Sequence, residues 1–156
     1  MNDGFESDKV IYFYTPEDAF GFMSNFAAYP IFLDGERWLT SEHYYQAQKF
    51  LDPDLKKVIR QASTPKQAFW LGRSKPVRSD WESIKITVMY NALLAKFTQH
   101  SILTEKLRQT GKKILVEKST GDYYWGCGTT GNGKNMLGIL LMQIRDQILQ
   151  DETKES

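Results

Sequence analysis

The chain has 156 residues, of which 41% are hydrophobic and 25% charged, and its formal net charge is +1. This length suits a single domain, and the near-neutral charge gives no basic field that would indicate a nucleic-acid partner. The apolar runs are too short for a membrane span, and the acidic, polar first residues are not those of a signal peptide. The single cysteine, Cys127, can form neither an internal disulfide nor a multi-cysteine metal site. We therefore expect a cytoplasmic protein without a bound metal or a membrane partner.

The first part of the chain carries strand and turn signals. A β-branched and aromatic stretch predicts a strand over 10–14, which a Thr-Pro turn ends. Two short apolar stretches flank Asp34-Gly35, a pair typical of a β-hairpin turn. Thr40 or Ser41 can then cap a helix that we expect to run to about Leu51.

Four further helices or helical turns are predicted in the middle of the chain. Pro53 and Pro65 each open a short helix, and this helical region ends near Gly72-Arg73. Apolar residues at helical spacing predict a long amphipathic helix over 80–98. Another helix follows and is closed by Gly111, a residue favoured just after a helix.

The last part of the chain predicts a strand over 112–119, a glycine-rich loop and an apolar helix over 135–149. The result is an α+β protein with more helix than strand. Its expected organisation is a flexible amino terminus over 1–9, one domain over 10–150 and a frayed polar tail over 151–156.

The glycine-rich stretch GCGTTGNGKNMLG, residues 126–138, matches two nucleotide-binding patterns by its letters. A P-loop needs Ser or Thr after its lysine, but Asn135 follows Lys134, and no buried strand precedes the glycines. A dinucleotide fingerprint needs an acidic residue on a second strand, but Asp151 lies in the tail. Both interpretations therefore fail.

Two other interpretations of the glycine-rich stretch remain. Asp122 and the rings of residues 123–125 adjoin the glycines, and Asn135 lies near the start of a helix whose N–H groups favour a phosphate. This combination suits a nucleotide or a ribosyl phosphate. The alternative is a plain surface turn in which Gly138 permits close helix packing.

A second informative stretch is TSEHYYQAQKF, residues 40–50. On a helix, Glu42, Tyr45, Gln46 and Lys49 share one face, so that the acid and the amine can reach one small ligand. The alternative is a solvated face on which Gln46 and Lys49 are merely exposed. His43 is expected to be a packing residue, because two histidines make a zinc site improbable.

Together these stretches resemble the NADAR family, in particular its YbiA-like N-glycosidase branch, from about Ile11 to Leu149. The resemblance is carried by S-N-F, by S-E-H with a downstream Q-x-x-K-type helix, by D-x-x-W-G and by G-x-N-x-L-G. It implies hydrolysis of an N-glycosidic bond between a ribosyl group and a base or amine. Phosphorylated intermediates of riboflavin biosynthesis are one implied substrate class, and ADP-ribosylated guanine, on a nucleotide or in DNA, is another.

Cleavage of a ribosyl C1′–N bond requires a carboxylate near C1′, a proton source and a nucleophile. Glu42 is the first candidate for acid/base catalysis and Asp122 the second, while Lys49 could instead form a Schiff base. No metal or organic cofactor is needed. A non-catalytic sensor of NAD-derived ligands is the alternative outside enzymes, and nucleic acid is a partner only in the DNA reading. The glycine-rich stretch and the Glu42–Lys49 face would form two opposite walls of a ribosyl-phosphate pocket. The expected substrate-binding residues are Ser24, Asn25, Phe26, Arg73, Trp81, Trp125, Gly126, Lys134 and Asn135. Arg78 is a further candidate for binding the phosphate.

Overall fold

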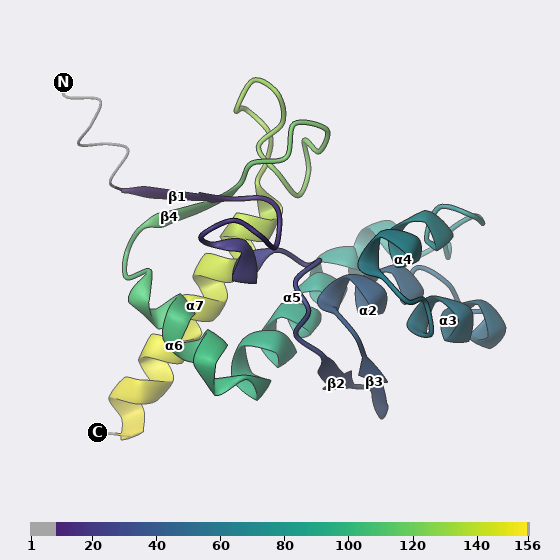
Figure 1. The fold of residues 1–156 in the computed structure, drawn as a ribbon, viewed down its shortest axis with the longest axis horizontal. Helices are drawn as coiled ribbons and strands as arrows, with labels where there is room; N and C mark the ends of the chain where they lie inside the picture. The colour runs from purple at the N-terminus through teal and green to yellow at the C-terminus, as the bar shows by residue number, and fades with distance from the viewer. Residues whose placement is uncertain (1–8, 156) are drawn as a thin grey trace. The chain divides into compact units, whose positions relative to one another are not determined.

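The computed structural model describes residues 9–155 and divides them into two units. The described residues up to Ser24 and from His100 onward form the terminal unit, and Asn25–Gln99 form the central unit. The described part of the chain is α+β with more helix than strand, as predicted (Figure 1). The predicted flexible segment 1–9 lies, except for Lys9, outside the described residues.

The terminal unit is built on a pair of parallel strands. Strand β1 (Val10–Phe13) pairs with β4 (Ile114–Glu117), and the short 3-10 helix η1 (Gly21–Met23) follows β1. Helix α7 (Met136–Glu155) packs against β4, and α6 (Ser101–Gln109) packs against α7 (Figure 1). The buried apolar side chains of this unit include Ile11, Phe13, Leu103, Leu107, Leu115, Leu137, Leu141 and Ile144.

In the terminal unit, the end of α6 agrees with the prediction from the sequence, and the end of α7 does not. Gly111 closes α6 with a φ of 65°, as predicted. The prediction that the last helix ends at Leu149 is wrong, because α7 continues to Glu155. No glycine or proline interrupts this stretch, and the Gln147 amide donates a hydrogen bond to Asp151 one turn later.

The central unit begins with the predicted hairpin. Strands β2 (Ile31–Leu33) and β3 (Glu36–Trp38) pair in an antiparallel register around a two-residue turn. Asp34 and Gly35 have φ angles of 55° and 77°, and positive φ at both central positions is the geometry that matches the twist of the flanking strands. The sequence pair Asp-Gly is therefore confirmed as a turn.

Four helices complete the central unit: α2 (Ser41–Ala47), α3 (Pro53–Arg60), α4 (Pro65–Leu71) and α5 (Trp81–Gln99). The first three begin where the sequence predicts, because an Asp or Thr side chain accepts a hydrogen bond from a first-turn N–H of each. For α2 this residue is Thr40, whose hydroxyl accepts from the backbone N–H of His43 at 3.2 Å.

Helix α2 lies in the middle of the central unit, in contact with α3, α4, α5 and β3, and every residue of Ser41–Ala47 is buried. The helix ends at Ala47, so the prediction that it runs to about Leu51 is wrong. The carbonyl oxygen of Lys49 has no helical partner, because Pro53 four residues later lacks an N–H, and it accepts instead from the backbone N–H of Arg78 at 2.8 Å. Proline at 53 also disfavours helical backbone just before it.

Gly138, in the first turn of α7, allows the helix to approach β4 closely. A Cβ atom at this position would lie 2.0 Å from the Leu115 carbonyl oxygen and 2.4 Å from Asn135 Nδ2. Alanine normally stabilises a helix by about 1 kcal/mol relative to glycine, but overlap of this kind costs about 1–3 kcal/mol or more. We expect Gly138→Ala to lower the free energy of unfolding in urea by at least about 1 kcal/mol.

Gly121→Ala is the matched control, because a Cβ at Gly121 would meet no atom within 4 Å. Its free energy of unfolding should stay within about 0.5 kcal/mol of the wild-type value. A Gly138→Ala protein as stable as this control would contradict the close approach of α7 to β4.

Candidate functional site

Glu42 and Gln46 lie one turn apart on α2 and are joined by a hydrogen bond. Gln46 Nε2 donates to Glu42 Oε1 at 2.6 Å. Only 7% of Glu42 and 2% of Gln46 is exposed, although both are polar residues that usually face solvent. The alternative interpretation of this stretch as a solvated helix face is therefore wrong for Gln46.

Lys49 follows the end of α2 and is partly buried. Its Nζ lies 5.5 Å from the centroid of the Tyr45 ring. Burial lowers the pKa of the Lys49 ammonium below its usual value, the Glu42 carboxylate opposes this, and the Arg73 guanidinium lowers the pKa further. The net decrease raises the fraction of neutral amine, the form of lysine that acts as a nucleophile.

Arg73 lies in the turn after α4, and its guanidinium acts electrostatically on Lys49. Its guanidinium carbon lies 4.5 Å from the centroid of the Phe69 ring, a cation–π geometry that orients the side chain. Trp81, at the start of α5, is only 6% exposed and packs edge-on against Tyr45 at a centroid distance of 5.2 Å. In this position Trp81 supports the ring that lies under Lys49.

Asn25 holds the beginning of α2. Its Oδ1 accepts a hydrogen bond from the Ser41 hydroxyl at 2.7 Å, and its backbone oxygen accepts from the N–H of Glu42 at 3.3 Å. These bonds fix the first turn of the helix, in which Glu42 lies. Ser24 is buried in the terminal unit and Phe26 is half-buried in the central unit, and their substrate contacts stay predictions.

His43 has the packing role that the sequence predicts. Its Nε2 lies 2.9 Å from the carbonyl oxygen of Ala62, which can only accept, so this nitrogen carries the proton. The Thr40 hydroxyl, 2.7 Å from Nδ1, then donates to the other nitrogen. Burial lowers the pKa of His43, in keeping with a neutral imidazole inside the helix cluster.

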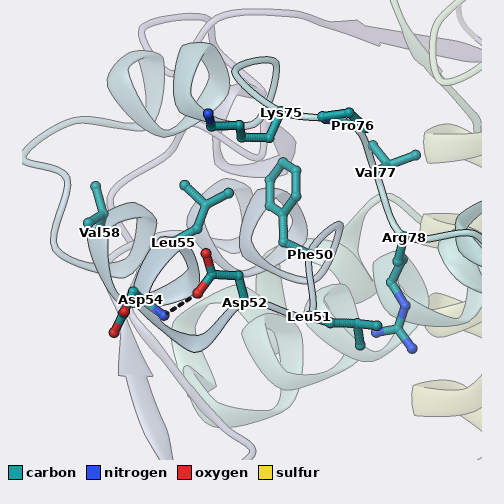
Figure 2. A pocket seen from close by; sticks show the side chains of 10 residues that line it. All are labelled: Phe50, Leu51, Asp52, Asp54, Leu55, Val58, Lys75, Pro76, Val77 and Arg78. Carbon is teal, nitrogen blue, oxygen red and sulfur yellow. Dashed lines mark hydrogen bonds between the residues drawn. The ribbon is translucent and has the colours of Figure 1, made fainter.

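A surface hollow of about 510 Å³ lies beside the end of α2 (Figure 2). It is lined by residues 50–52, by Asp54, Leu55 and Val58 of α3 and by residues 75–78. Arg78 is the one sequence-predicted residue that lines it, and the side chain of Arg78 pairs with Asp80 at 2.6 Å. Glu42 and Lys49 do not line the hollow, so it is separate from the polar group on α2.

In the terminal unit, the glycine-rich stretch is fastened by its own backbone. The N–H groups of Met136 and Leu137, in the first turn of α7, donate to the carbonyls of Tyr124 and Trp125 at 3.0 and 3.1 Å. These are donors that the sequence interpretation assigned to a phosphate. The assignment is wrong for these two groups, because the preceding segment of the protein already occupies them.

Asn135 contributes to the same fastening with its side chain. Its Oδ1 accepts from the N–H of Glu117 at 3.0 Å and its Nδ2 donates to the carbonyl of Leu115 at 2.9 Å. Both polar groups of the amide are therefore bonded to β4. Lys134, by contrast, is exposed, and its Nζ lies 5.6 Å from the centroid of the Tyr124 ring.

Asp122 closes a turn before the glycines. Its Oδ1 accepts from the N–H groups of Tyr124 and Trp125 at 2.9 and 2.8 Å. The Trp125 ring packs edge-on against Tyr124, and Gly126 is buried against Ser119. That this stretch and the polar face of α2 are walls of one pocket stays a prediction.

Comparison with known proteins identifies the family. The NADAR domain model matches residues 12–149. The chain belongs to the NADAR family. It is 52% identical to N-glycosidase YbiA of Escherichia coli over 143 residues, which cover 90% of this chain and 89% of YbiA. The NMR structure of YbiA matches with a TM-score of 0.86 and 50% identity, covering 94% of this chain and 88% of that one. A riboflavin biosynthesis protein of Vibrio vulnificus is 41% identical over 90% of this chain and 39% of its own length.

Within residues 9–155, no group of three or more His, Cys, Asp or Glu side chains is placed to bind a metal ion. No helix in this part of the chain is long and apolar enough to cross a membrane. The polar groups that α2 gathers are a carboxylate, an amide and an amine.

The sequence does not reveal two residues that the structure places beside Glu42 or its partner. It puts Gln46 on the same face as Glu42 without indicating a role for it, and it indicates for Gly72 only the end of a helix. A Cβ at Gly72 would lie 1.9 Å from Gln46 Oε1. The i, i+4 spacing of Glu42 and Gln46 was a usable signal for their contact, but nothing local in the sequence connects Gly72 with either.

The bonds of Asp122 predict how this turn responds to substitution. Asp122→Ala removes two hydrogen bonds and should lower the free energy of unfolding by about 1–3 kcal/mol. Asp122→Asn keeps an acceptor oxygen at the same place and should change it by less than about 1 kcal/mol. Thermal or urea unfolding measures both. Equal stability of Asp122→Ala and wild type would show that the turn does not depend on this side chain.

Proposed function

We propose that this NADAR-family protein is an N-glycosidase that hydrolyses the C1′–N bond of phosphorylated ribosylaminopyrimidines and releases ribose 5-phosphate. The observation that carries the proposal is a buried carboxylate beside a partly buried amine: Glu42, on α2, acts electrostatically on Lys49, which follows the helix and has a lowered pKa. The name of the Escherichia coli relative supports the reaction, and that of the Vibrio vulnificus relative supports a substrate from riboflavin biosynthesis.

The reaction can proceed through Lys49. A ribosylamine opens its sugar ring to an imine between C1′ and the pyrimidine nitrogen, and the neutral Lys49 amine adds to C1′. Proton transfer to the pyrimidine nitrogen then breaks the C1′–N bond and leaves a Schiff base between C1′ and Nζ. Water adds to C1′ and expels the Lys49 amine. The net change is one water consumed, one pyrimidine amine released and one ribose 5-phosphate released.

We assign to Glu42 the proton transfers that these steps require. As a carboxylate it accepts a proton from the attacking amine or water, and as a carboxylic acid it returns one to the departing nitrogen. Asp122 is the second acid candidate, although its Oδ1 already accepts two backbone hydrogen bonds. We place the reaction in the cytoplasm, where the single Cys127 would stay a thiol.

The first test replaces the proposed acid/base group. Glu42→Gln keeps an oxygen that can accept from Gln46 and should fold normally, yet it should lose at least about 100-fold in turnover, the usual contribution of a general acid or base. Release of ribose 5-phosphate from flavin-pathway ribosylaminopyrimidine phosphates measures the rate. Glu82→Gln, an exposed change on α5, is the control and should retain activity.

The same assay distinguishes the substrates. Release from the pyrimidine compounds and none from ADP-ribosylated guanine, as a nucleotide or in DNA, is the expected result. Activity only on ADP-ribosylated guanine would make the alternative enzyme the right one, and binding of ADP-ribose without turnover of either compound would indicate a sensor. Wild-type turnover by Glu42→Gln would contradict the role of Glu42.

The second test concerns Lys49. Borohydride added during turnover should reduce a Schiff base and leave a ribosyl phosphate adduct on Lys49, which mass spectrometry locates. Because the lysine pKa is lowered, the initial rate of adduct formation should rise with pH, as the ammonium loses its proton, and level off below the ordinary lysine value of about 10.4.

The control separates chemistry at Lys49 from general labelling of lysines. Lys49→Arg cannot form the adduct, because its guanidinium stays protonated. Lys57→Arg, an exposed change on α3, should be trapped like the wild type. Turnover without any adduct on Lys49 would leave direct attack of water, assisted by Glu42, as the mechanism.

A further inference from the structure

The amide of Gln46 is held in one orientation by the carboxylate beside it. Gln46 Nε2 donates to Glu42 Oε1 at 2.6 Å, a short distance typical of hydrogen bonds to charged groups. The opposite orientation would set two acceptor oxygens against each other. Gln46 Oε1 is consequently buried, and within the described residues it accepts no hydrogen bond.

Gly72 provides the space that this orientation needs. A Cβ there would lie 1.9 Å from Gln46 Oε1 and 2.7 Å from Gln46 Cδ. The backbone at Gly72 has φ −64° and ψ −13°, which any residue can adopt, so glycine is not required for its conformation. Glycine is required at this position because any side chain would overlap the amide of Gln46.

A purely structural role does not explain a glutamine at this position. An apolar side chain of the same length, such as methionine, would fill the volume without leaving a buried acceptor unsatisfied. The polar amide therefore carries a cost in stability, and its side chain bonds to Glu42. The group that this hydrogen bond stabilises is the Glu42 carboxylate.

We propose that Gln46 is a positioning residue for the hydrolysis: it holds the Glu42 carboxylate in one rotamer and favours its ionised form, and Gly72 keeps the space for its amide. The inference rests on the proposed function, in which Glu42 begins as a proton acceptor. An N–H donor stabilises a carboxylate more than a carboxylic acid, so the bond keeps Glu42 ready to accept.

Other charged groups around α2 are already engaged and would not change in the variants below. The Glu42 carboxylate and the Arg73 guanidinium both act electrostatically on Lys49, which follows the end of α2. On the neighbouring elements, Lys56 donates to Gln48, Lys85 pairs with Glu82, Lys96 lies over the rings of Tyr29 and Phe97, and Arg60 pairs with Glu36. The other charged side chains on α3, α4 and β3, which are Asp54, Lys57, Lys66 and Arg37, are exposed.

The test combines a titration with kinetics. Gln46→Met removes the donor at nearly constant length. In the ¹³C NMR spectrum of carboxyl-labelled protein, with Glu42 assigned by its loss in Glu42→Gln, the midpoint of Glu42 should rise by about one pH unit or more. With the ribosylaminopyrimidine phosphates, kcat should fall about 10-fold or more, while KM should change much less.

Gly72→Ala tests the same arrangement without altering either polar residue. Its methyl group should displace the amide and produce the same two changes, a higher Glu42 midpoint and a lower kcat. Gln61→Met, an exposed change after α3, and Gly121→Ala are the controls, and both should match the wild type. Circular dichroism confirms that each variant is folded.

An unchanged Glu42 midpoint in Gln46→Met, or in Gly72→Ala if Gln46→Met does not fold, would overturn the inference. So would wild-type kcat in both folded variants. Failure of the proposed function looks different: Glu42→Gln would then keep full turnover, whereas the midpoint of Glu42 in the free protein could still respond to Gln46.

Discussion

The arrangement of the central unit depends on α2, a helix that carries polar side chains and is nevertheless buried along its whole length. A buried polar group that finds no partner inside the protein costs stability, and on α2 the side chains of Ser41, Glu42 and His43 find one, whereas Gln46 Oε1 does not. The Ser41 hydroxyl donates to Asn25, and His43 bonds Thr40 on one side and Ala62 on the other. These bonds fix the cap of α2 and tie the helix to two separate segments, at Asn25 and Ala62, which leaves it little freedom to shift. Glu42 lies in the turn that they hold most firmly.

The glycine-rich stretch of the terminal unit follows the same rule with backbone groups. Hydrogen bonds from Met136 and Leu137 close its base, and the Asn135 side chain attaches that base to β4. Gly138 then lets α7 approach the strand closely enough for these bonds to form. The glycines are thus explained in large part by close packing and by turns such as that at Gly128, whose φ is 70°. This explains why the loop resembles nucleotide-binding motifs in its letters and differs from them in its bonds.

Features decided by neighbouring residues could be predicted from the sequence, and features decided by distant ones could not. The turn at Asp34-Gly35 and the cap at Thr40 depend on residues within a few positions, and both were predicted. The segment after α2 is held by a bond from Arg78 to Lys49, residues far apart in the sequence, and no local pattern indicates this contact. The helical spacing of Glu42 and Lys49 placed both residues on one face but could not show how deeply that face is buried.

The contact between Gln46 and Gly72, which the sequence does not reveal, affects the pKa of Lys49 through Glu42. Neutral amine is required for Schiff-base formation, and burial together with Arg73 favours it. The Glu42 carboxylate opposes this by stabilising the ammonium. By keeping Glu42 ionised, the Gln46 amide therefore raises the pKa of Lys49 relative to a site with a protonated acid. The arrangement gives up part of the neutral amine population, and in return a proton acceptor is ready beside the amine at the moment of attack.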